Sequence, residues 1–186
     1  MAAIPHWRAR PLRYSATAKA MHWAIAAAVI ALIPEGLTMK RLIAEGPTRE
    51  RLYDLHEAVG ALVLIVMVLR LARRAAFGAP AADPALTPTD RRASLAAQYA
   101  LYALLLVVPA LGWAGTNAYG DPVSVFGLFE FPAILARDPP LSDRIFGWHL
   151  AGALLVAAIV ALHVAGALYH HFGRRDRVLA RMLPGG

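Results

Sequence analysis

The chain has 186 residues, of which 59% are hydrophobic and only 17% are charged, and its mean hydropathy is +0.50. This composition is typical of an integral membrane protein and excludes an ordinary soluble domain. The absence of cysteine excludes disulfides, thiolate metal sites, iron–sulfur clusters and covalently attached c-type haem. Any bound metal must therefore be held by histidine or carboxylate.

Four long apolar runs alternate with polar segments that are too short to fold alone. They predict an all-α integral membrane protein, a four-transmembrane-helix bundle that forms one domain over residues 1–186. The basic leader before the first run lacks a clean cleavage site, so we expect it to be retained. We expect the helices over residues of about 16–39, 55–74, 94–116 and 145–171.

Basic residues are distributed unequally between the two sides of such a bundle. If the N-terminus is inside, the inner segments hold 13 of the 19 Lys and Arg residues. The positive-inside rule then predicts that both termini are cytoplasmic, in a multi-pass protein of the bacterial inner membrane. The same asymmetry accounts for the pI of about 10.4, so nucleic acid is not needed as a partner. The six outer basic residues are Lys40, Arg41, Arg49, Arg51, Arg137 and Arg144.

The last apolar run, residues 145–169, contains two histidines, His149 and His163, and no charged residue. They are 14 residues apart, which places them roughly 40° apart around a helix and roughly 21 Å apart along it. One lies near each end of the span, on a shared face. An ionisable residue inside a membrane indicates function by default, so two on one stripe suggest two stacked sites.

A glycine follows each of these histidines by three residues, Gly152 after His149 and Gly166 after His163. The missing side chains would leave room for a flat macrocycle, and neutral imidazole is a usual axial ligand of haem iron. The alternative is that the small residues serve close helix packing and that the histidines form hydrogen bonds between helices.

Two further histidines lie at matching depths in the first two helices. His22 is close to the cytoplasmic end, as is His163, and His56 opens the second helix at the outer face, as His149 opens the last. The simplest arrangement is two bis-histidine haem sites, His22 with His163 and His56 with His149. Zinc fits less well, because each level offers two histidines where a structural zinc site takes four ligands.

Several strings in this order resemble the bacterial cytochrome b561 family over nearly the whole chain: RYSATAKAMHW, LYDLHEAVGALVL, a proline-bearing third helix, IFGWHLAGALL and ALHVAGALYHHF. The resemblance implies a four-helix bundle with two b-type haems that exchanges electrons with ubiquinone. It also implies, for one activity known in the family, oxidation of superoxide at the outer face. The family's four haem ligands then fall on His22, His56, His149 and His163.

A quinone site is expected at the cytoplasmic side. His170 lies seven residues after His163, on nearly the same face, and could hydrogen-bond a quinone carbonyl and relay its proton. Arg70, Arg73 or Arg74 could supply positive charge to the reduced quinone. The alternative is an interfacial histidine with arginines that extend to the membrane surface.

Superoxide is an anion, so basic residues near the outer site are candidates for steering it. Lys40, Arg41 and Arg51, with Arg49, lie in the first outer loop, but the outer segments carry a net charge of −3. The superoxide assignment therefore depends on the resemblance. The apolar outer segment SVFGLFEFPAIL is expected to lie along the interface as a short amphipathic piece that covers the outer haem.

The resemblance favours a superoxide:ubiquinone oxidoreductase with two b-type haems, iron being held by the four histidines. The alternative is a haem-bearing membrane anchor that passes electrons between a soluble redox partner and the quinone pool. A haem-free structural or transporter-like bundle is a third interpretation. No glycine-rich nucleotide motif follows a strand, which argues against direct oxidation of NADH. Membrane lipid is an expected partner, and a homodimer is left open.

Overall fold

The computed structural model describes residues 13–83 and 86–183, so His6 and the leader arginines Arg8 and Arg10 lie outside the described residues. Four helices make up most of it, each long and apolar enough to cross a membrane. A π-helical turn, η2 (Tyr169–Arg174), and a short 3-10 turn, η3 (Ala180–Met182), follow the last helix. The expected all-α membrane bundle is confirmed. The helices are α1 (Ala16–Arg41), α2 (Pro47–Phe77), α3 (Pro88–Tyr119) and α4 (Pro139–Leu168).

Three of the helices begin about two turns earlier than expected, at Pro47, Pro88 and Pro139. Each of these prolines occupies the first turn, where the missing N–H costs nothing. At the start of α3, Thr87 and Asp90 form a reciprocal capping box. The first turns are polar, so hydropathy alone places the helix starts too late. As a result His56 lies in the third turn of α2 and not at its entrance.

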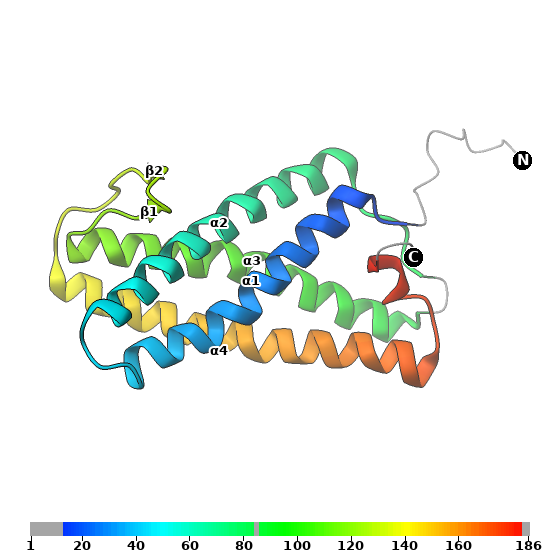
Figure 1. Ribbon diagram of the computed structural model, residues 1–186. Helices are drawn as coiled ribbons and strands as arrows, with labels where there is room; N and C mark the ends of the chain where they lie inside the picture. Colours follow the sequence, from blue (N-terminus) through cyan, green and yellow to red (C-terminus); the bar gives the residue numbers. More distant parts are fainter. Residues whose placement is uncertain (1–12, 84–85, 184–186) are drawn as a thin grey trace, which may run out of the picture.

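The bundle is elongated, and its two ends differ (Figure 1). The start of α1, the end of α4 and the connection from α2 to α3 lie at one end, which we call the termini end. The connection from α1 to α2 and the two short strands between α3 and α4 lie at the other, which we call the hairpin end. Helices α3 and α4 pack against each other along their lengths, whereas α1 crosses α4 with few contacts.

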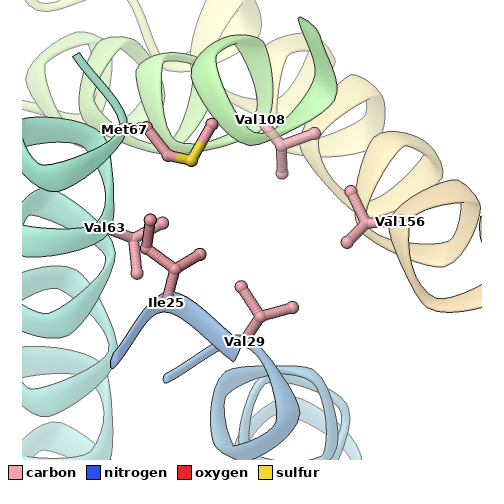
Figure 2. Close-up of a cluster of buried hydrophobic side chains, with 6 residues drawn as sticks. All are labelled: Ile25, Val29, Val63, Met67, Val108 and Val156. Carbon is pink, nitrogen blue, oxygen red and sulfur yellow. The ribbon is translucent and has the colours of Figure 1, made fainter. Parts of the chain in front are cut away.

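The buried core lies midway along the bundle and takes side chains from all four helices (Figure 2). Val156 of α4 is seven residues from His149 and seven from His163, so the core separates the two histidine levels. Lipid is as apolar as these side chains, so close contact rather than the hydrophobic effect holds such helices together. The core consists of Ile25, Val29, Val63, Met67, Val108 and Val156.

The segment between α3 and α4 forms an antiparallel hairpin of β1 (Ser124–Val125) and β2 (Phe129–Glu130). Val123 and Val125 are buried in a cluster with Ala61 of α2. The tip turns through positive φ at Phe126 (53°) and Gly127 (71°), as a type I′ turn requires. The expected amphipathic segment is therefore a two-stranded hairpin, and it packs on the end of the bundle.

Candidate functional site

Four histidines from three helices come together as two facing pairs. At the termini end the ring centroids of His22 (α1) and His163 (α4) lie 6.3 Å apart, with the planes at 70°. At the hairpin end those of His56 (α2) and His149 (α4) lie 6.2 Å apart, at 73°. The structure thus brings together the same partners that matching depth had paired.

The ring spacing is compatible with two imidazoles that share one metal ion. A metal–imidazole bond is about 2 Å and the nitrogen lies about 1 Å from the ring centre, so two axial imidazoles place their centroids about 6 Å apart. A direct nitrogen–nitrogen hydrogen bond of about 3 Å would bring the centroids to about 5 Å. Both observed pairs match the first value.

His149 is held by the backbone of α3. Its Nδ1–H donates a hydrogen bond of 2.8 Å to the carbonyl of Val108, which leaves Nε2 with a free lone pair. Gly112 makes the close approach of the ring possible, because a Cβ at that position would lie 3.2 Å from Cε1 of His149. The backbone of α3 therefore sets both the orientation and the tautomer of this imidazole.

His56 rests in a similar way on α1. A Cβ at Gly36 would lie 3.0 Å from Cε1 of His56, so the ring packs directly on the α1 backbone. The neighbouring Glu35 brings Oε2 to 3.7 Å from Nδ1 of His56. Glu35 was not identified as a site residue from the sequence, although a carboxylate inside an apolar span is itself an indicator of function.

A cavity of about 380 Å³ opens between the helices at the hairpin end, and we call it the hairpin cavity. His56 and His149 both line it, together with Gly60 and Gly147. A Cβ at either glycine would meet no atom within 4 Å, so both border open space. The volume lies within the range of cofactor sites, and the walls are largely apolar, as such sites usually are.

Charges of both signs line the hairpin cavity. Of the three basic residues expected to steer an anion, Lys40 lines it, whereas Arg41 and Arg51 do not. Glu57 and Asp143 also line the cavity, so Lys40 stands among carboxylates. Glu57 accepts a hydrogen bond of 2.9 Å from Oγ1 of Thr116, which joins α2 to α3; sequence patterns gave no signal for this pair.

A second cavity, of about 310 Å³, lies at the termini end beside α1 and α2, and we call it the arginine cavity. Arg70, Arg73 and Arg74 line it, with Tyr102 of α3. Arg70 donates to the carbonyl of Ala18 at 2.8 Å, and Arg74 lies 5.5 Å over the Tyr102 ring. Within residues 13–83 and 86–183 no carboxylate pairs with these three arginines.

His170 is engaged elsewhere. Its Nδ1 hydrogen-bonds Oδ2 of Asp176 at 2.5 Å, and His170 does not line the arginine cavity. Next to it, Arg174 forms a 3.0 Å salt bridge with Asp90 of α3. The structure therefore brings Arg70 and Arg73 into one cavity but places His170 in contacts that fasten the end of α4.

The two glycines that follow the α4 histidines have different surroundings. A Cβ at Gly152 would lie 2.6 Å from Cγ2 of Val108, so this glycine allows close packing of α3 on α4. A Cβ at Gly166 would meet nothing within 4 Å. Of these two glycines, Gly166 alone borders open space, although it is exposed and lines neither cavity.

Comparison with known proteins assigns the chain to a family. A family model described as "Prokaryotic cytochrome b561" matches residues 13–185. The chain belongs to the prokaryotic cytochrome b561 family. It is 34% identical over 173 residues to cytochrome b561 homolog 2 of Escherichia coli K12, covering 93% of this chain and 92% of that protein.

Two further relatives extend the comparison. Cytochrome b562 of Cereibacter sphaeroides is 32% identical over 172 residues, which are 88% of this chain and 90% of that protein. A protein named "Probable superoxide oxidase CybB" from Yersinia pestis is 26% identical over 130 residues, which are 70% of this chain and 73% of that protein.

This match confirms the family that the sequence resembles and confirms membrane electron transfer as the general function. The chain is a multi-pass protein of the bacterial inner membrane, in a family whose members transfer electrons with b-type haem. Histidine is a usual axial ligand of haem iron. The expected site residues, the four histidines included, stay predictions.

Proposed function

We propose that this cytochrome b561 family member holds two b-type haems, one between His22 and His163 and one between His56 and His149. The observation that carries the proposal is the pair of ring separations, 6.3 and 6.2 Å, which suit two imidazoles on one iron. Haem, when bound, supplies one-electron redox chemistry. The protein supplies position, ligands and a dry interior.

The side chains divide this work between them. At each level the two histidines would hold the haem iron, which would serve for electron transfer and not for the binding of dioxygen. The carbonyl of Val108 keeps the proton of His149 on Nδ1, so that Nε2 is free to ligate. The buried apolar core around Val156 lies between the two levels.

We propose further that the termini end faces the cytoplasm. The excess of arginine and lysine in the segments at that end supports this orientation through the positive-inside rule. The hairpin cavity would then open toward the periplasm and the arginine cavity toward the cytoplasm. Electrons that cross the bundle from one cavity to the other would cross the membrane.

For the substrates we propose superoxide at the hairpin end and ubiquinone at the arginine cavity. Two superoxide anions lose one electron each and leave as dioxygen, and one ubiquinone gains two electrons and two protons to become ubiquinol. The relative named a superoxide oxidase and Lys40 at the hairpin cavity support the donor. Arg70 and Arg73, which line a cavity that includes aromatic side chains, support the acceptor.

The test begins with the detergent-purified protein. Haem is quantified per chain and a reduced-minus-oxidised spectrum is recorded; we expect two low-spin b-type haems. Enzymatically generated superoxide should then reduce a soluble ubiquinone analogue, and added superoxide dismutase should abolish that reduction. A protein without haem would overturn the whole proposal. A dihaem protein that ignores superoxide but co-purifies with a soluble redox enzyme would instead be a membrane anchor.

A further inference from the structure

One buried carboxylate of α1 has no role in the function proposed above. Glu35 lies inside a membrane-spanning helix, and only 16% of its side chain is exposed. Its Oε1 is buried without a hydrogen-bond partner. A buried polar atom without a partner costs about 1–3 kcal/mol, so its retention indicates a use.

The atom that faces Glu35 also lacks a partner. Nδ1 of His56 is buried without a hydrogen bond and lies 3.7 Å from Oε2 of Glu35. In the described parts of the chain no lysine or arginine forms a salt bridge with Glu35. Two unpartnered groups of complementary chemistry therefore face each other, slightly beyond hydrogen-bond distance.

The local sequence of α1 explains how they meet. Glu35 is followed by Gly36, whose missing Cβ lets the His56 ring approach the helix. His56 lines the hairpin cavity and Glu35 does not. A proton on Nδ1, the nitrogen that lies 3.7 Å from Glu35, would leave the lone pair of Nε2 for a ligand.

We infer that Glu35 is a positioning residue for His56: its carboxylate accepts the Nδ1–H hydrogen bond and so fixes the ring and its tautomer. This inference rests on the proposed haem at the hairpin end. Metal-ligating histidines usually donate their second N–H to a carboxylate or carbonyl, and a carboxylate makes the imidazole a more basic ligand. His149 has the carbonyl partner, Val108, and His56 has the carboxylate.

The experiment isolates the hairpin-end haem by working in a His163→Ala chain, which should keep only that haem. In this background Glu35→Gln retains an acceptor oxygen, so we expect haem to stay bound and its midpoint potential to rise, because the negative partner is gone. Glu35→Leu removes the acceptor, so we expect loss of most of the remaining haem and altered g-values in electron paramagnetic resonance. Glu50→Gln, an exposed carboxylate of α2, is the control and should change neither.

The reverse background completes the test. In a His149→Ala chain, which should keep only the termini-end haem, Glu35→Gln should leave potential and haem content unchanged. The inference is overturned if both Glu35 variants behave as their parent in the His163→Ala chain, or if Glu35→Gln alters the termini-end haem equally. If Glu35→Leu does not fold, Glu35→Gln decides. A parent chain that binds no haem would instead contradict the proposed function.

Discussion

The two ends of the bundle hold their histidine pairs in different ways. At the hairpin end each ring packs on the backbone beside a glycine, Gly36 for His56 and Gly112 for His149, and each Nδ1 faces an acceptor. At the termini end no side-chain hydrogen bond to His22 or His163 is found among the described residues, and the nearest ring neighbour of His22 is Trp23, at 5.3 Å. Contacts with the neighbouring helices therefore hold both rings at the hairpin end, and among the described residues no such hydrogen bond holds the rings at the termini end.

One ring of each pair lies near a charged side chain, and these two charges have opposite signs. Glu35 lies beside His56. Arg70 donates a hydrogen bond to the carbonyl of Ala18, one helical turn before His22. A nearby cation favours the reduced, more negative state of a redox centre, and a nearby carboxylate disfavours it. The comparison therefore predicts electron flow from the hairpin end toward the termini end.

The largest effect should come from removing one ligand at each end. His149→Ala should lose the hairpin-end haem and His163→Ala the termini-end haem, each leaving about one haem per chain, because each imidazole serves one site. Haem analysis and redox titration of the purified variants measure this. Equal loss of both haems from each variant would contradict two separate sites.

A methyl group added at a glycine on which an imidazole packs should weaken haem binding at the hairpin end only. Gly112→Ala and Gly36→Ala place a Cβ about 3 Å from an imidazole, and overpacking of about 1–3 kcal/mol corresponds to haem that is retained roughly 5- to 150-fold less well. Transfer of haem to apomyoglobin reports the rate of loss. Gly166→Ala meets no protein atom within 4 Å, so any loss that it causes should be confined to the termini-end haem.

Neutralising Arg70 should reduce the electrostatic difference between the two ends. We expect Arg70→Gln to lower the midpoint potential of the termini-end haem by about 40 mV, or ~1 kcal/mol for one electron, with the hairpin-end haem unchanged. Redox titration measures both potentials. Arg91→Gln, exposed on α3 outside the arginine cavity, is the matched control, and an equal shift in it would show that only the general surface charge matters.

The smallest effect should come from the hydrogen bond between Thr116 and Glu57. Thr116→Val leaves the partly buried Glu57 without this donor and should lower the stability of the hairpin end by about 1 kcal/mol. Thr116→Ser keeps the hydroxyl and should behave as the parent. Thermal unfolding in detergent, followed by haem absorbance, compares the three proteins. Equal stability of all three would show that this hydrogen bond does not stabilise the hairpin end.

Periodicity and hydropathy predicted much of the architecture. The four spans follow from the apolar runs, and the 14-residue spacing of His149 and His163 places one imidazole at each level of a single helix, whatever surrounds it. Depth along each span then suggested His22 as the partner of His163 and His56 as the partner of His149. The rings of each pair do face one another. The helix starts were misplaced because capping by Thr87 and the first-turn prolines acts outside the apolar pattern.

The sequence by itself determined that the chain spans the membrane four times and carries two levels of histidine, because these properties depend on composition and on spacing within one helix. Only the tertiary structure decided what lies behind each ring. Gly36, Gly112 and Glu35 belong to helices other than those of the histidines that they touch. Their contacts depend on how α1 and α3 are rotated against α2 and α4, and no spacing within a single helix specifies that rotation.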